Sequence, residues 1–149
     1  MTNTERNVKM AGISRKEART AVYELLFETE FRHDEAPEQI FDTAVEVREL
    51  PTDDYVKTVY FGVLENKEAI DELIEKYSKG WKIDRISRAA LCAMRICIYE
   101  MLHIKNIPVN VSINEAIELT KGYDEEKTRG FVNGVLNGVK DHILGSENG

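Results

Sequence analysis

Three basic side chains near the start of the sequence could bind a phosphate group. Arg15, Lys16 and Arg19 follow Ser14, which forms a Ser-x-x-Glu capping box with Glu17 and so predicts a helix start. Because residues four apart share a helix face, Arg15 and Arg19 are expected on one surface. Guanidinium and ammonium groups in such a place contact RNA or DNA phosphates. The alternative is that all three are ordinary solvated charges.

A second basic group lies near the end of the sequence. Lys121, Lys127 and Arg129 surround the loop before the last expected helix, and Phe131 follows two residues after Arg129. An aromatic ring beside cations can stack on an unpaired base. The competing interpretation places Phe131 in the core and leaves the cations in solvent.

No set of residues predicts catalysis or metal binding. The histidines, His33, His103 and His142, are scattered and lack the spacing of metal ligands. Cys92 and Cys97 stand five apart in an apolar helical pattern, which favours buried free thiols over a disulfide. The sequence also has no phosphate-binding glycine loop and no Gly-x-Ser-x-Gly elbow. We therefore expect a protein that is not an enzyme and uses neither a cofactor nor a metal.

The composition fits a globular protein that stays out of the membrane. Of the 149 residues, 42% are hydrophobic and 32% are charged, and the length indicates a single domain over 1–149 with a flexible lead-in over 1–12 and a flexible tail over 145–149. No run approaches the roughly 18 apolar residues of a membrane helix, so a cytoplasmic location is expected. The net charge of −7 disfavours a general nucleic-acid binder. Acidic residues dominate 33–55 and basic residues dominate 76–105, however, which permits a local basic surface.

Apolar residues recur at helical spacing along the chain, which predicts an all-α fold, a compact bundle of six or seven helices. The first helix is expected from Ser14 to about Arg32, and the second from Pro37 to a point before Leu50. A third stretch begins at 52–54 and forms either one helix or two with a break near Asn66.

The second half of the sequence continues the helical pattern. Trp81 is expected to tuck under the bundle, and Ser87 to open an apolar helix. Within that helix the charge of Arg95 needs a partner, for which Glu100 is a candidate. A second capping box at 112–115 predicts the start of the next helix.

The last expected helix carries glycines at 130, 134 and 138, which lie on one stripe. Each glycine in a helix interior costs about 1 kcal/mol relative to alanine. We expect the stripe to permit a close helix neighbour while the apolar positions of the same helix face the core.

Four stretches together resemble the NusB family of bacterial transcription antitermination factors. They are RKEAR at 15–19 leading to Leu26-Phe27, MRICIYEML at 94–102, INEAIEL at 113–119 and FVNGVL at 131–136. Each stretch is modest alone, but the four in this order and spacing form a specific signal over nearly the whole chain.

This resemblance implies an all-helical protein that binds the boxA element of ribosomal RNA leader transcripts. It also implies a heterodimer with the ribosomal protein NusE that joins the transcribing RNA polymerase. RNA contacts are then assigned to the start of the first helix and to the surroundings of FVNGVL, that is, to Arg15, Lys16, Arg19, Lys121, Lys127, Arg129 and Phe131. Partner contacts are assigned to Phe27 and to the start of the central helix, at Arg88 and Leu91.

The sequence departs from the family pattern at several of these places. Glu17 dilutes the arginine run of many members, Ala90 stands where many have an acidic residue, and an acidic residue often found near Lys127 is missing. A similar helical module begins a class of ribosomal RNA cytosine methyltransferases, but this sequence ends at Gly149 without their catalytic domain, which favours the non-enzymatic interpretation. The alternative function is a protein-interaction bundle, such as a homodimer, that binds no RNA; the acidic net charge favours it.

Overall fold

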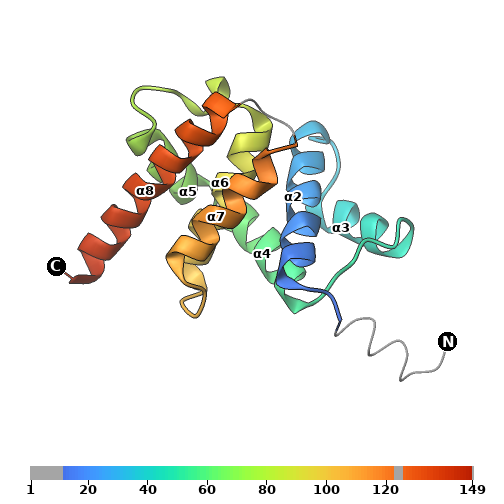
Figure 1. The fold of residues 1–149 in the computed structure, drawn as a ribbon. Helices are drawn as coiled ribbons and strands as arrows, with labels where there is room; N and C mark the ends of the chain where they lie inside the picture. Colours follow the sequence, from blue (N-terminus) through green and yellow to red (C-terminus); the bar gives the residue numbers. More distant parts are fainter. Residues whose placement is uncertain (1–11, 123–125, 149) are drawn as a thin grey trace. The chain divides into compact units, whose positions relative to one another are not determined.

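The computed structural model describes residues 12–122 and 126–148, and in these ranges it contains seven α-helices, one 3-10 helix and no β-strand (Figure 1). The prediction of an all-α fold is confirmed. The chain forms two compact units, one ending at Phe61 and one beginning at Gly62, and each is described by itself. The prediction of a single domain stays a prediction, and the lead-in expected over 1–12 lies outside the described residues apart from Gly12.

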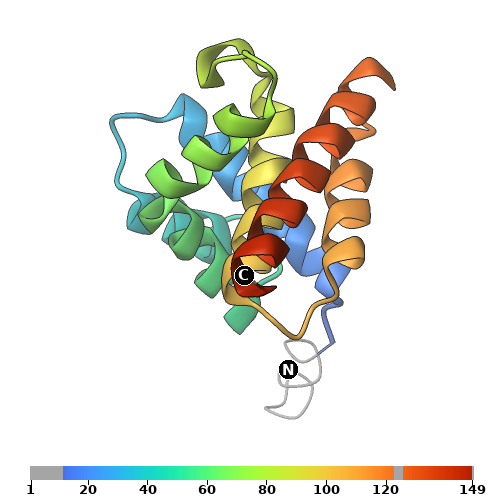
Figure 2. The ribbon, with the colours of Figure 1, turned by 90° about the vertical axis from the view of Figure 1, so that its left-hand side faces the viewer.

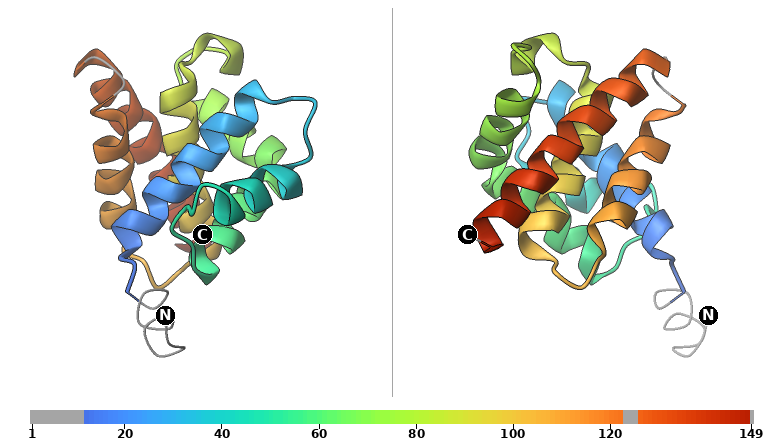
Figure 3. Two further views of the ribbon diagram at one scale, coloured as in Figure 1. Left: turned by 90° about the vertical axis from the view of Figure 1, so that its right-hand side faces the viewer. Right: turned by 60° about the vertical axis from the view of Figure 1, so that its left-hand side comes forward.

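The first unit contains α2 (Arg15–Phe31), α3 (Pro37–Glu46) and most of α4 (Asp54–Glu65). Ser14 caps α2 as predicted, because its hydroxyl oxygen accepts a hydrogen bond from the backbone N–H of Glu17 at 3.0 Å. Pro37 occupies the first turn of α3, where its missing N–H costs nothing. Figure 3 shows α2 and α3 lying beside each other.

Polar contacts tie the helices of the first unit together. The hydroxyls of Thr29 in α2 and Tyr60 in α4 lie 2.7 Å apart. Arg48, which follows α3, forms two hydrogen bonds with the carboxylate of Glu28 in α2, at 3.1 and 2.7 Å. Phe41 of α3 adds ring contacts with Tyr60 and Phe61, with ring centroids 6.1 and 5.4 Å apart.

The second unit is built around α6 (Arg88–His103), in which every residue from Ala89 to Met101 is buried. The helices α5 (Lys67–Tyr77), α7 (Val109–Thr120) and α8 (Glu126–Asn148) pack on α6, and the 3-10 helix η1 (Ile83–Arg85) leads into it (Figure 2). The break at Asn66 separates α4 from α5, which decides between the one-helix and two-helix alternatives.

Two buried polar contacts hold α6 to its neighbours. Arg95 pairs with Asp71 of α5 through two 2.9 Å hydrogen bonds, a partner that the sequence did not suggest. Glu100 accepts a 2.6 Å hydrogen bond from the hydroxyl of Ser112. Ser112 therefore does not cap a helix: α7 begins a turn earlier, after Pro108, and Ser112 lies inside it.

The glycine stripe of α8 has a neighbour at only part of its length. A Cβ atom at Gly138 would lie 2.7 Å from a ring carbon of Tyr77 in α5, so this glycine permits a close helix approach. At Gly130 and Gly134 a Cβ atom would meet no described atom within 4 Å. The expectation of a close neighbour is therefore correct for Gly138 and wrong for the other two.

The helix α8 continues to Asn148, into the segment predicted as a flexible tail from 145, and the flexibility of that tail stays a prediction. The segment contains no proline that would stop it. In the described part of the chain, no helix is long and apolar enough to cross a membrane.

Candidate nucleic-acid interface

The predicted basic cluster at the start of α2 divides into exposed and buried members. Arg15 and Lys16 are exposed, whereas Arg19 is only 5% exposed. The guanidinium of Arg15 lies 4.2 Å from the ring centroid of Tyr55 in α4, a cation–π contact that limits its rotamers. Of the two arginines expected on one exposed face, only Arg15 is therefore exposed to solvent, and Arg19 is buried.

Arg15 and Lys16 occupy an unusual position for cations. The N-terminal turn of a helix is the positive end of its dipole. Each cation there therefore destabilises the helix by about 0.3–1 kcal/mol, whereas an acidic residue would stabilise it by a similar amount. Glu17 offsets part of this cost, because it is the acidic residue of the first turn. Two exposed cations at this end together raise the local positive potential, which favours an anionic partner.

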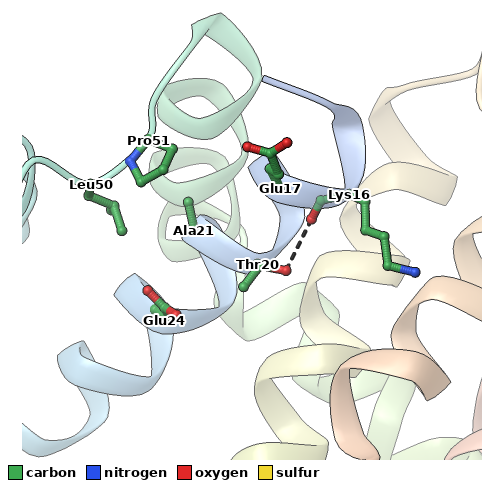
Figure 4. Close-up of a pocket in the computed structure, with 7 residues that line it drawn as sticks. All are labelled: Lys16, Glu17, Thr20, Ala21, Glu24, Leu50 and Pro51. Atoms are coloured by element: carbon green, nitrogen blue, oxygen red, sulfur yellow. Dashed lines mark hydrogen bonds between the residues drawn. The ribbon is translucent and has the colours of Figure 1, made fainter. Parts of the chain in front are cut away.

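A pocket of about 230 Å³ adjoins these residues but does not suit a phosphate (Figure 4). Its lining includes the carboxylates of Glu17 and Glu24 and the apolar side chains of Leu50 and Pro51. In Figure 4 the Lys16 ammonium points away from Leu50 and Pro51. An anion in the pocket would face two carboxylates, so the pocket itself is a poor phosphate site.

The second predicted basic group flanks residues 123–125, which lie outside the described ranges. Lys121, just after α7, is exposed and forms a 2.7 Å ion pair with Glu118. Such exposed pairs are worth about 0–1 kcal/mol, so a phosphate could replace Glu118 at little cost. Lys127 in the first turn of α8 is exposed, and Arg129 is half-buried.

Phe131 lies one helical turn after Lys127 and is half-buried, not enclosed in the core. Its ring meets Trp81 edge-on, with centroids 6.3 Å apart and an interplanar angle of 66°. Trp81 itself is 54% exposed, so the expectation that it tucks under the bundle is wrong. The sequence signal that could have placed it outside is the polar turn around it, Ser78-Lys79-Gly80 before and Lys82 after.

The three predicted partner-contact residues have different environments. Phe27 of α2 is half-buried, and its ring lies 5.1 Å from that of Phe31, which is 63% exposed. Arg88 is exposed at the first position of α6, whereas Leu91 has no exposed surface. Phe27 and Arg88 therefore have solvent-accessible surface, whereas the Leu91 side chain is enclosed.

Within the described ranges, no three histidine, cysteine or acidic side chains gather in a way that could hold a metal ion. Cys92 and Cys97 are buried in α6 and are not joined by a disulfide.

Comparison with known proteins gives a consistent result. A sequence profile of the NusB family matches residues 14–141. The transcription antitermination protein NusB of Acetivibrio thermocellus is 42% identical over 139 residues, which cover 92% of this chain and 95% of that protein. NusB of T. maritima has a similar structure, with a TM-score of 0.77 and 36% identity over 85% of this chain and 90% of that one. A structure of antitermination factors NusB and NusE in complex with dsRNA is similar with a TM-score of 0.75 and 29% identity, covering 86% and 96% of the two chains.

Proposed function

The chain belongs to the NusB family, and we propose that it is a transcription antitermination factor that binds boxA RNA of ribosomal RNA leader transcripts together with NusE. Through this complex it joins the transcribing RNA polymerase in the cytoplasm, and it performs no catalysis. The observation that carries the proposal is the family match over residues 14–141, which includes both basic clusters and Phe131. The relative solved with NusE and RNA supports the choice of partners.

We assign the RNA-binding surface to two groups of residues. Arg15 and Lys16 at the start of α2 supply phosphate contacts, and their exposure supports this role. Lys121, Lys127 and Arg129 do the same near α8, where Phe131 offers a ring to a base. Arg19 remains a predicted contact, although only 5% of its surface is exposed.

RNA binding is tested with the full chain, purified NusE and a labelled boxA-like RNA, in single-stranded form and annealed to its complement. Fluorescence anisotropy at several salt concentrations gives the affinity and its salt slope. Replacing both Arg15 and Lys16 with alanine should weaken binding and reduce the slope of log K against log salt by about 1.4, since each single-strand phosphate contact contributes about 0.7.

A matched control removes two positive charges elsewhere. Lys57 of α4 and Lys67 of α5 are both exposed, and their double alanine variant should leave the salt slope unchanged. If both double variants lower affinity equally, the effect is one of net charge and the α2 surface is not the RNA site. If the wild-type protein with NusE binds neither RNA form, the proposal fails.

NusE is proposed to contact Phe27 and the start of α6. Arg88→Ala should weaken the heterodimer, measured by calorimetry without RNA, whereas Leu91→Ala should act mainly on stability because that side chain is fully buried. The competing function, a protein-interaction bundle without RNA, is favoured by the net charge of −7. Sedimentation with and without RNA separates the two, because only the first function predicts a heavier species when RNA is added.

A further inference from the structure

The turn between α5 and η1 presents Trp81 to solvent in a fixed backbone geometry. The hydroxyl of Ser78 donates to the carbonyl of Trp81 at 2.6 Å, and the N–H of Trp81 donates back to the carbonyl of Ser78 at 3.2 Å. Ser78 is only 1% exposed, so these bonds are shielded from water. The backbone that carries the exposed indole is therefore held in place.

The same turn adopts an uncommon conformation. Lys79 and Gly80 both have positive φ, at 52° and 90°. A lysine in the left-handed region costs free energy that an ordinary loop avoids. The N–H of Ile83 closes the far side of the turn by donating to the Glu75 carboxylate at 3.1 Å. The turn backbone is thus fixed by several contacts, and it carries an indole that is 54% exposed, which burial of apolar surface does not explain.

The surroundings of the indole are cationic and aromatic. Lys79 and Lys82 flank Trp81 in the sequence and are both exposed. Phe131 contacts the ring at an interplanar angle of 66°, and Lys127 lies one turn before Phe131 on α8. Rings interleaved with lysines are typical of surfaces that bind single-stranded nucleic acid, in which bases stack and phosphates meet cations.

We propose that Trp81 is an RNA-contacting residue whose indole stacks on an unpaired base, with Phe131 holding the ring edge-on. The inference rests on the proposed RNA-binding function and adds a residue to it. Phosphates on either side of the stacked base meet Lys79, Lys82 and Lys127. The surface therefore prefers RNA with at least one unpaired base over a continuous duplex, because a paired base already stacks within its helix.

The test uses the full chain with NusE and the labelled single-stranded boxA-like RNA. Trp81→Ala should weaken binding between about five-fold and about 150-fold, the range expected for loss of one base–aromatic stack. Trp81→Phe should recover most of the affinity, since it keeps a stacking face. Val111→Ala, which truncates a 43% exposed apolar side chain of α7, is the control and should bind as the wild type does.

A second readout follows Trp81 in the wild-type complex. Trp81 is the only tryptophan of the chain, so subtracting the emission of the Trp81→Phe complex from that of the wild-type complex isolates its fluorescence. Single-stranded RNA should quench this signal, and the annealed duplex should quench it less.

The outcomes separate the inference from the function on which it rests. Tight RNA binding by the wild type, with equal affinity for Trp81→Ala and no quenching, overturns the role of Trp81 and leaves the antitermination function intact. Equal quenching by strand and duplex also overturns stacking on an unpaired base. Failure of the wild-type complex to bind RNA removes both proposals.

Discussion

Arg95 of α6 and Asp71 of α5 face each other in a parallel, two-bond geometry, with both nitrogen–oxygen distances at 2.9 Å. The two side chains are 5% and 17% exposed, so the pair is largely shielded from water. A planar guanidinium matches a carboxylate through two parallel hydrogen bonds, and the second bond costs little additional side-chain entropy. The pair therefore fixes how α5 lies against the central helix.

Replacing Asp71 with alanine should lower the free energy of unfolding by about 3 kcal/mol, because the buried guanidinium loses its carboxylate. The double variant Asp71→Ala with Arg95→Met should recover more than half of that loss, since it also removes the guanidinium that lost its carboxylate. Urea unfolding followed by circular dichroism measures both. A cost below about 0.5 kcal/mol for the single variant would show that the pair acts like an exposed one.

This pair also shows the limit of reading contacts along one helix. The charge of Arg95 in an apolar run requires a partner, and the sequence predicts that need correctly. The candidate that the sequence offers is Glu100, the acidic residue of the same helix. Asp71 is not suggested, because the spacing of residues along one helix does not show that α5 packs against α6. Asp71 stands 24 residues away, and only the packed structure brings it within reach.

Local signals succeeded where the physical cause is local. Ser14 and Ser87 mark helix starts through hydrogen bonds to the first turn, and Pro37 does so through its fixed φ and missing N–H; all three predictions are confirmed. The box at 112–115 failed because Pro108 starts α7 one turn earlier, which places the Ser112 hydroxyl against buried Glu100.

At the candidate site, too, local features were predictable from the sequence and tertiary burial was not. The sequence shows which residues are cationic, but not that Arg19 is buried while Arg15 stays exposed. Trp81 was expected inside because of its large apolar surface. The left-handed turn at Lys79 and Gly80 overrides that tendency, and its conformation depends on the buried bonds of Ser78.

The glycines of α8 provide a matched pair of opposite predictions. Gly134→Ala should raise the free energy of unfolding by about 1 kcal/mol, because its Cβ meets no described atom and alanine favours the helix. Gly138→Ala should lower it by about 1–3 kcal/mol, because its Cβ would lie 2.7 Å from the Tyr77 ring. Thermal unfolding of both variants checks the signs. Equal shifts would mean that Tyr77 does not pack on Gly138.

Ser112→Ala should destabilise the protein although it removes only one oxygen atom. Glu100 is 1% exposed and accepts the Ser112 hydroxyl at 2.6 Å, so the variant leaves a buried carboxylate oxygen short of a donor. The expected loss is about 1–3 kcal/mol by urea unfolding. Asn114→Ala changes an exposed side chain of the same helix and should shift stability by less than about 0.5 kcal/mol. Comparable losses for both would remove the special role of the buried bond.

Glu28 and Arg48 should make stability depend on pH in the acid range. The two hydrogen bonds from Arg48 lower the pKa of the Glu28 carboxyl, outweighing the partial burial that acts in the opposite direction. A carboxyl whose pKa is lowered by folding stabilises the protein fully above its unfolded pKa, about 4.3, and this contribution is lost as the pH falls through the lowered value.

Arg48→Gln should therefore reduce stability at about pH 7 and reduce it less as the pH falls toward about 3, because protonation of the Glu28 carboxyl removes the charge that Arg48 pairs with. Urea unfolding of the variant and the wild type at both pH values measures the two differences. Lys57→Gln, which removes an exposed charge of α4, is the control and should show a much smaller change between the two pH values.

Arg32 also contacts Glu28, at 3.1 Å, so the Arg48→Gln variant keeps part of the effect and the Glu28 pKa should rise only partway to its ordinary value. A destabilisation by Arg48→Gln that is the same at both pH values would mean that Arg48 acts through packing of its side chain rather than through the charge of Glu28.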